Sequence, residues 1–544
     1  MTKLRVRISL LELQNEYERG NKKPLEDLMR AWKGIKELPY DDLKSFFKLG
    51  GYHGEPFRGA GWGNSAYWGG YCNHGNVLFP TWHRVYLVKL EEALQSIPGC
   101  EEVMLPFWDE SDEYSRRNGI PWPLTNEFFE LDGVQIPNPL RSFVFPVNIT
   151  DNISGDDPNY SKPKNYETVR YPLSGIVGNA KEIAATKAHN EQFPDYETNV
   201  RHLNNNVLNW LNSSIVVKGK KIETHVVKQF RDCLDAPNYT VFSNTTSAAQ
   251  WNAERQTIDP ETGQPVPGSY KVVVPLESPH NSLHLAIGGC DVPNYNRSPI
   301  EGANGDMGEN DTAGLDPIFY FHHCNIDRMF WIWQKRHDAV DKLEIISEYP
   351  GTNSVDSQGP TAGFAPNSWL TLESPLAPFK HGIDNDGPTY TSLDCINIET
   401  QLGYTYAPGS MDGEDAGLLA LAKVDYPTKV IKVSGINKAP IRGSFMISAY
   451  LTIDGEKLHL GTEAVLSRWN SQYCANCQTH TEVKAFFELP VVESKMLEAL
   501  NAEDYSNVEV EIKGRGGLFS NSETSAKLLL AGERPPVRFR MEII

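Results

Sequence analysis

The 544-residue chain contains no run of about 18 apolar residues, so no transmembrane helix is expected. It also lacks an excess of positive charge: 51 lysines and arginines against 70 aspartates and glutamates give a net charge of −19. A charge of this sign repels nucleic acids and anionic membranes, so we expect neither as a partner. The N-terminus has no apolar signal core and no small-residue cleavage site, which favours a cytoplasmic location.

Cysteine is scarce, and its eight copies are scattered rather than arranged as a disulfide framework. A chain of this length buries enough apolar surface to fold without disulfides, so most thiols are expected to be reduced. Cys474 and Cys477 form a Cys-x-x-Cys pair. It is open to three interpretations: a redox dithiol, half of a zinc site, or a soft ligand pair for Cu(I). The zinc interpretation is the weakest, because the sequence has no second Cys-x-x-Cys.

The hydrophobic pattern divides the chain into two parts, as its length leads one to expect. As far as about Arg336, helical segments, the first a charged helix predicted over 10–32, alternate with loops rich in glycine, proline and asparagine. Past about Tyr426 the apolar residues recur with period two, and Asp454-Gly455 is a hairpin turn signal. We predict a mainly α domain over 1–407, built on a four-helix bundle, a linker over 408–425, and a C-terminal antiparallel β-sandwich over 426–544.

Two groups of histidines stand out among the fourteen in the chain. His280 and His284 are four residues apart, so on a helix they lie on one face and can bind one metal ion together. A third imidazole would come from His322 or His323 on the next predicted helix. Three imidazoles without a carboxylate favour copper or zinc over calcium or magnesium, which prefer oxygen ligands.

The second group lies near the N-terminus and comprises His53, His74 and His83. The residues after His83 have the apolar spacing of a helix, with Pro80 near its start. The segment 51–75 is rich in glycine and aromatic residues, so His53 and His74 are expected on irregular backbone. The other histidines show no such spacing and are interpreted as structural or exposed. The sequence therefore predicts two metal ions, each held by neutral imidazoles.

Two longer motifs carry a resemblance to a known family. The segment His74-x4-Phe-Pro-Thr-Trp-His-Arg-x2-Leu-x3-Glu91 resembles the copper A signature of the tyrosinase, catechol oxidase and molluscan haemocyanin family. The segment Asp316-Pro-x-Phe-Tyr-x2-His323-x3-Asp327 resembles its copper B signature. The resemblance implies a type 3 site with two copper ions and O2 as co-substrate. Its ligands would be His53, His74 and His83 for one copper, and His280, His284 and His323 for the other.

The resemblance also implies roles for residues around the ligands. His322 becomes a packed or hydrogen-bonded neighbour. Cys72 is expected to form a thioether bond with His74, the alternative being a free buried thiol. Phe319 is expected to pack on the ligand rings and guard the substrate entrance, and Asp327 to orient an imidazole or a neighbouring arginine. The pair Tyr404 and Tyr406 resembles a closing motif that packs against Arg7; the alternative is a strand with aromatic residues on one face.

Three functions follow from what reaches the copper ions. A tyrosinase hydroxylates monophenols and oxidises o-diphenols to o-quinones. A catechol oxidase or o-aminophenol oxidase lacks the first activity, and a haemocyanin-like protein only carries O2. Glu277 and Asn281 favour tyrosinase, because members with that activity have such a pair to hold a water molecule; alternatively, Glu277 is a solvated loop residue. A single dicopper unit without repeats favours an enzyme whose partners are small phenols.

The resemblance extends to the C-terminal domain, which in latent family members covers the copper ions. Trp469 and Tyr473 are expected to plug the entrance, and the linker near 408–416 to be the cutting site of an activating protease. Cys474 and Cys477 are expected near the entrance, where they would deliver Cu(I) to the histidines. The alternative is that this domain only stabilises the catalytic one.

Overall fold

A computed structural model describes residues 4–54, 71–151, 160–175, 180–254, 272–289, 305–354, 368–382, 385–413, 428–438, 441, 443–468, 482–502, 505–514, 517–520 and 537–544. Four residues named above, Trp469, Tyr473, Cys474 and Cys477, lie outside this part of the chain, as does most of the predicted linker. Among the described helices, none is long and apolar enough to cross a membrane.

Four helices meet at the centre of the larger part of the molecule: α3 (Phe46–Gly54), α4 (Phe79–Gln95), α11 (Glu277–Gly288) and α12 (Ile318–Arg336). Every residue of α11 and nearly every residue of α12 is buried, because other elements cover these helices on all sides. The covering helices are α1 (Leu10–Glu18), α2 (Lys23–Glu37), α5 (Glu113–Asn118), α6 (Ala180–Asn190), α7 (Tyr196–Asn212), α8 (Val226–Cys233), α9 (Tyr239–Ser243) and α10 (Thr245–Glu254). The predicted helical domain with a four-helix centre is confirmed.

Short strands and 3-10 turns join these helices. The antiparallel hairpins are β2 (Phe128–Leu131) with β3 (Val134–Pro137), β4 (Ile149–Asp151) with β5 (Tyr160–Lys162), β6 (Ser214–Val217) with β7 (Lys220–Glu223), and β8 (Pro375–Lys380) with β9 (Thr389–Thr391). The 3-10 turns are η1 (Trp122–Leu124), η2 (Asp306–Gly308), η3 (Ala313–Leu315), η4 (Pro350–Thr352) and η5 (Ser392–Cys395).

Two sequence predictions about local structure are wrong. The single helix over 10–32 is two helices, α1 and α2, because Gly20 adopts φ +96° and Pro24 starts a new helix at its first turn. His53 lies near the end of α3 and not on irregular backbone. Its helix begins at Phe46, outside the glycine-rich segment that the prediction considered, and the residues 55–70 lie outside the described part.

The C-terminal part consists of two antiparallel sheets, in the orders β14-β11-β17 and β13-β12-β15-β16, as predicted. Their strands are β11 (Thr428–Asn437), β12 (Phe445–Ile453), β13 (Glu456–Val465), β14 (Glu482–Pro490), β15 (Val508–Gly514), β16 (Gly517–Ser520) and β17 (Arg540–Ile543), with one helix, α15 (Ser494–Leu500). Asp454 and Gly455 form the predicted two-residue turn between β12 and β13, both with positive φ. Along β15 buried and half-buried residues alternate, which is the period-two signal of the sequence.

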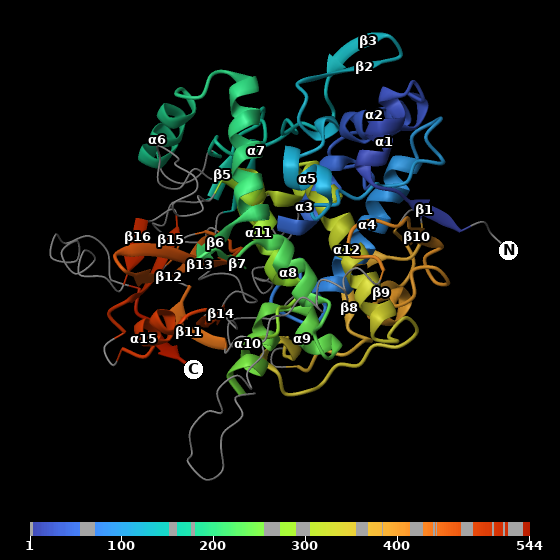
Figure 1. Ribbon diagram of the computed structural model, residues 1–544. Helices are drawn as coiled ribbons and strands as arrows, with labels where there is room; N and C mark the ends of the chain where they lie inside the picture. The colour runs from blue at the N-terminus through green and yellow to red at the C-terminus, as the bar shows by residue number, and fades with distance from the viewer. Residues whose placement is uncertain are drawn as a thin grey trace.

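Each of the two parts contributes side chains to the apolar core of the other. Ile215, Val217 and Ile222 of the β6–β7 hairpin belong to the apolar cluster of the β-sandwich. Met446 and Ala464 of the sandwich belong in turn to the cluster of the helical domain. Figure 1 shows the orange and red strands beside α8, α10 and α11, while β1 and β10 lie on the opposite side of the helices.

A buried ion pair joins two of the central helices. Arg84 Nε of α4 donates to Asp327 Oδ1 of α12 at 2.6 Å, and both side chains are almost unexposed. Asp327 Oδ2 accepts hydrogen bonds from Tyr404 and Tyr406, each at 2.6 Å. Burial alone would raise the pKa of Asp327, but Arg84 and then Arg7 outweigh it and hold that pKa below its usual value.

These contacts decide two sequence predictions. Of the two roles expected for Asp327, the contact with a neighbouring arginine is the one observed. The packing of the tyrosine pair against Arg7 is confirmed: β1 (Arg5–Arg7) pairs in parallel with β10 (Tyr404–Tyr406), and the Arg7 guanidinium lies 3.7 Å from the centre of the Tyr404 ring.

Replacing Arg84 by methionine should lower the free energy of unfolding by about 3–5 kcal/mol, because Asp327 would keep a buried charge without this partner. Denaturant unfolding of the metal-free protein, followed by tryptophan fluorescence, measures the change. Lys33→Met serves as the control, since Lys33 and Glu37 form an exposed pair on α2 worth about 0.5 kcal/mol or less. A loss for Arg84→Met no larger than for the control would contradict the central role of the pair.

Candidate metal centre

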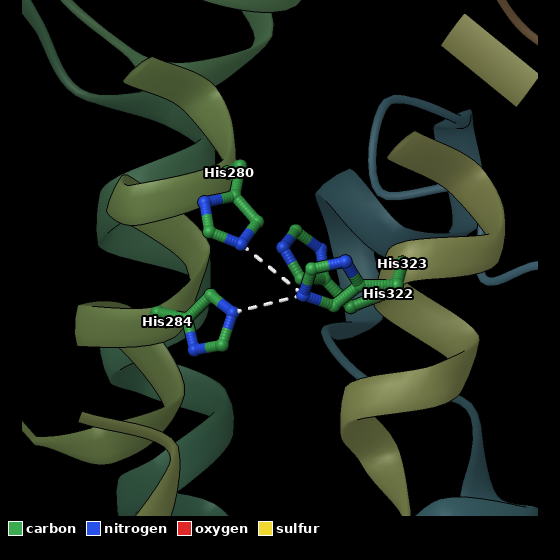
Figure 2. A group of neighbouring side chains, drawn as sticks. All are labelled: His280, His284, His322 and His323. Carbon is green, nitrogen blue, oxygen red and sulfur yellow. Dashed lines mark hydrogen bonds between the residues drawn. The ribbon is translucent and has the colours of Figure 1, made fainter. Parts of the chain in front are cut away.

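Three imidazoles converge between α11 and α12. His280 Nε2 lies 3.1 Å and His284 Nε2 lies 3.2 Å from His323 Nε2, as Figure 2 shows. The i, i+4 spacing on α11 aims both of its histidines at α12. These nitrogens are close enough together for the three rings to hold one metal ion.

His322 lies beside this triad and also offers a nitrogen to it. The nitrogens of His280, His284, His322 and His323 all lie within 4.8 Å of one another. However, His322 Nδ1 is hydrogen-bonded to Glu110 Oε1 at 2.7 Å, whereas His323 Nε2 approaches both histidines of α11. His322 thus has the expected hydrogen bond, with Glu110 as its partner, while its Nε2 is buried without a hydrogen-bond partner among the described residues. Its assignment as a neighbour and not a ligand stays a prediction.

The second group of histidines is also assembled. Nitrogens of His53, His74 and His83 lie within 4.8 Å of one another. His53 comes from the end of α3, His83 from the first turns of α4, and His74 from the segment before α4. The two groups face each other: the rings of His83 and His323 stack at 4.6 Å, and those of His74 and His280 lie 5.5 Å apart.

The hydrogen bonds of these rings leave one nitrogen of most of them available to a metal. The Nδ1 atoms of His53, His83 and His284 each face a backbone carbonyl oxygen, of Asn310, Phe79 and Met307, at 2.7–2.9 Å. A carbonyl accepts only from a protonated Nδ1, which leaves Nε2 with a free lone pair. Within the described residues, Nε2 of His53 and His83 and both ring nitrogens of His74 are buried without a hydrogen-bond partner.

Burial also keeps the rings neutral, as metal binding requires. It lowers the pKa of His83 to about 3 and that of His284 to about 4, and it holds the pKa of His53, His74, His280 and His323 well below 6.5. Six neutral imidazoles in two facing groups of three fit two copper ions, with three rings for each. That these six are the ligands stays a prediction, supported by this geometry.

Phe319 packs on the histidine rings, as predicted. Its ring stacks on that of His323 with centroids 3.9 Å apart and meets the edge of His53 at 4.8 Å. The side chain is fully buried, and its role as a guard of the substrate entrance stays a prediction.

Cys72 is buried beside the first triad, with its Sγ 3.4 Å from Asn310 Nδ2. Burial raises the pKa of this thiol, although the nearby Arg468 opposes the shift. The thioether bond between Cys72 and His74 stays a prediction.

Glu277 is the first residue of α11 and is buried, so its interpretation as a solvated loop residue is wrong. Its carboxylate accepts hydrogen bonds from Gly75 N at 2.8 Å, Thr245 N at 2.8 Å and Thr245 Oγ1 at 3.0 Å. Burial raises the pKa of Glu277 against these hydrogen bonds. Asn281 Oδ1 lies 2.9 Å from His280 Nδ1, so this amide orients one ring of the centre.

A cavity of about 100 Å³ lies beside His74, between the two parts of the molecule. His74, Glu277, Asn281 and Asn310 line it from the helical domain. Lys438 and the end of β13, as far as Arg468, line it from the β-sandwich. The cavity therefore provides polar groups next to the metal-binding nitrogens, and the C-terminal part forms one of its walls.

Comparison with known proteins decides the family. Residues 43–336 match the family model described as the common central domain of tyrosinase. The chain belongs to the tyrosinase family. It is 51% identical to a tyrosinase of Hahella sp. (strain CCB-MM4), over 91% of this chain and 90% of that protein. It is 46% identical to a tyrosinase of Aspergillus oryzae (strain ATCC 42149 / RIB 40), over 88% of this chain and 90% of the relative.

Solved structures of tyrosinases have the same fold over almost the whole chain. A tyrosinase of Burkholderia thailandensis at low pH has 49% identity and a TM-score of 0.82, covering 99% of this chain and 100% of that one. An Aspergillus oryzae pro-tyrosinase mutant at 16% identity has a TM-score of 0.61, covering 99% and 91%, which shows the fold alone. This tyrosinase-family chain is thus a copper oxidoreductase with the family's helical domain and a C-terminal β domain.

Three residues at the centre were missed from the sequence: Glu110, Asn310 as a carbonyl acceptor, and Arg468. Glu110 follows Trp108-Asp109 in a short polar stretch with no periodic signal. The Asn310 contact uses a backbone atom, on which the residue type has no bearing. Arg468 immediately precedes the predicted plug at Trp469, but the direction of its side chain depends on how the β-sandwich packs on the helical domain.

The metal-free protein should lose stability as pH falls from about 6.5 to about 4. In this window unfolded histidines take up protons that the buried rings exclude, so acid favours the unfolded chain. Each excluded proton contributes about 1.4 kcal/mol per pH unit. In His83→Asn this slope should decrease by about that amount, as measured by denaturant unfolding at several pH values.

His202→Asn, at an exposed position of α7, is the matched control and should retain the wild-type slope. An unchanged slope in His83→Asn would show that the ring of His83 is not kept neutral by burial.

Proposed function

We propose that this chain hydroxylates monophenols and oxidises o-diphenols to o-quinones with O2 at a type 3 dicopper centre. The observation that carries the proposal is the pair of facing imidazole triads beside a cavity that contains Glu277 and Asn281. Bound copper would supply the redox chemistry of O2 and phenol. The names of the similar proteins and structures, which are tyrosinases, support this assignment.

The residues of the chain prepare the site for this reaction. Hydroxylation requires a phenol that loses its proton near neutral pH, and a buried carboxylate with a raised pKa suits that transfer. Glu277 is such a group on the cavity wall, where with Asn281 it would hold a water molecule that relays the proton. The rings of Phe319 and Phe79, which pack on the histidines, exclude water from the other side.

The second candidate is an oxidase of catechols or o-aminophenols without monophenol activity. One observation favours it: both oxygens of Glu277 already accept hydrogen bonds from Gly75 and Thr245, so fewer lone pairs remain for a water molecule. Oxygen carriage alone is the remote alternative, since the chain has one dicopper unit rather than a tandem array.

Copper-loaded protein should contain two copper ions per chain and oxidise both tyramine and a catechol. Glu277→Gln should lower the rate with tyramine at least tenfold more than the rate with the catechol, because only the monophenol has to lose a proton through this side chain. Elemental analysis and initial rates of quinone formation measure these effects after activation of the enzyme.

Glu482→Gln is the control, since this acidic residue lines the same cavity from β14. A single copper per chain, or no quinone from either substrate, would refute the proposed function. An unchanged ratio of the two rates in Glu277→Gln would refute only the role of Glu277 and support the second candidate.

We propose further that the β-sandwich keeps the enzyme latent. Arg468, just past β13, donates from Nη1 to Gly54 O at 2.7 Å and lies 3.3 Å from Asp311 Oδ1. Its Nη2 lies 3.7 Å from Cys72 Sγ. Gly54 follows His53, and Cys72 precedes His74 by two residues. The Arg468 guanidinium therefore contacts the chain next to two of the three histidines of the first triad. Glu463 adds a hydrogen bond from Ser278 Oγ at 2.9 Å.

The other predictions for this domain concern residues outside the described part. Trp469 and Tyr473 remain the proposed plug, and Cys474 and Cys477 the proposed copper-delivery pair. Cutting in the linker by a protease remains the proposed activation. The first residues of the linker are held by the helical domain, since Arg328 Nη2 donates to Ser410 O at 2.6 Å and pairs with Asp412, so the cut is expected beyond Asp412.

Replacing Arg468 by alanine should raise the catechol oxidation rate of the uncut protein roughly tenfold or more. The reason is that removing one partner of a buried, hydrogen-bonded charge pair weakens the docking that closes the site. Lys457→Ala, on β13 but paired within the sandwich, is the control and should remain latent. Equal activity before and after limited proteolysis of the wild-type chain would remove the latency proposal altogether.

A further inference from the structure

One short turn orients a ring in each triad. Met307 O accepts from His284 Nδ1 at 2.7 Å, and Asn310 O accepts from His53 Nδ1 at 2.9 Å. The two carbonyls are three residues apart, on η2 and the residues that follow it. A displacement of this turn would therefore release a histidine of both triads at once.

Backbone hydrogen bonds hold the turn to its neighbours: Gly305 N donates to Gly288 O of α11, and Asp306 N donates to Val169 O at 2.8 Å. The turn contains one 3-10 helix of three residues, whose hydrogen-bond geometry is poorer than that of an α-helix. The backbone of the turn also lies directly against the backbone of α11 at Gly288. There is no room for a side chain at this position, because a Cβ atom added to Gly288 would lie 2.1 Å from Gly308 N. This close approach and the backbone hydrogen bonds set the distance between the turn and His284, and buried side chains add further anchors.

Lys162 at the end of β5 provides such an anchor. Its ammonium lies 2.5 Å from Asp306 Oδ1 and 3.4 Å from Glu309 Oε2, and all three side chains are almost completely buried. Asp306 Oδ2 accepts from Tyr166 OH and from Val169 N, each at 2.7 Å. Asp306 immediately precedes Met307, and Glu309 immediately precedes Asn310, so each anchored residue adjoins one of the two carbonyls.

We propose that Lys162 is a positioning residue for both metal sites: its ammonium holds two carboxylates and thereby the two carbonyls that orient His284 and His53. Without it, two carboxylates would remain buried next to each other with one cation fewer, and they would have to separate or take up protons. The inference rests on the copper pair proposed above.

The test is Lys162→Met, with copper affinity as the readout. Competition with a Cu(I) chelator should show at least a tenfold weaker affinity for both copper ions. In the metal-free variant, the ring 15N–1H NMR signals of the Nδ1-protonated forms of His53 and His284, assigned with His53→Asn and His284→Asn, should weaken or disappear. The matched control is Lys89→Met, because Lys89 is also buried and pairs with Glu92 at 2.9 Å, on the far part of α4 from His83.

The control separates positioning from general stability. If Lys89→Met lowers the melting temperature of the metal-free protein as much as Lys162→Met but leaves copper affinity unchanged, the proposal holds. Equal copper affinities in the wild type and Lys162→Met would overturn it, as would a loss confined to one copper. Tyr166→Phe removes one hydrogen bond to Asp306 but leaves the charge pair intact. It should weaken the affinity for both copper ions a few-fold, and it provides a test even if Lys162→Met does not fold. Wild-type protein that binds no copper would instead refute the proposed function.

Discussion

The buried pair of Arg84 and Asp327 is the contact on which the geometry of the centre depends. Arg84 directly follows His83 on α4, and Asp327 lies one turn after His323 on α12. The pair therefore fixes the distance between His83 of one triad and His323 of the other. The free-energy cost of desolvating the pair is offset by hydrogen bonds to Gln334, two backbone carbonyls and two tyrosine hydroxyls. Nearly every polar atom of the pair therefore has a hydrogen-bond partner.

The histidine rings follow a second rule, since the partner of Nδ1 selects the nitrogen that faces the metal. The Nδ1 partner is a backbone carbonyl for three rings and the Asn281 side chain for a fourth. The Nδ1 atom of His322 has a carboxylate, that of Glu110, as its partner. Carbonyl oxygens cannot lose their acceptor capacity by protonation near neutral pH, so these rings keep their tautomer over a wide pH range.

The sequence predicted the family, both groups of histidines, the helical and β parts and the Asp454-Gly455 turn, because these depend on local spacing. It did not predict the break in the helix at Gly20, the helix that carries His53, or the burial of Glu277. Those depend on which segments pack against one another. Glu110, Arg468 and Lys162 were missed for the same reason: each meets its partners across more than a hundred residues of chain, a separation that no local pattern reveals.

The β6–β7 hairpin has a consequence for the cut protein. Ile215, Val217 and Ile222 lie in the core of the β-sandwich, although they belong to the helical part of the chain. A peptide bond broken in the linker therefore leaves two fragments joined by continuous apolar packing. A cut that activates the enzyme therefore has to be followed by separation of this packing, which exposes these three side chains to water. Activation is thus expected to leave a new apolar patch on the β6–β7 hairpin of the helical domain.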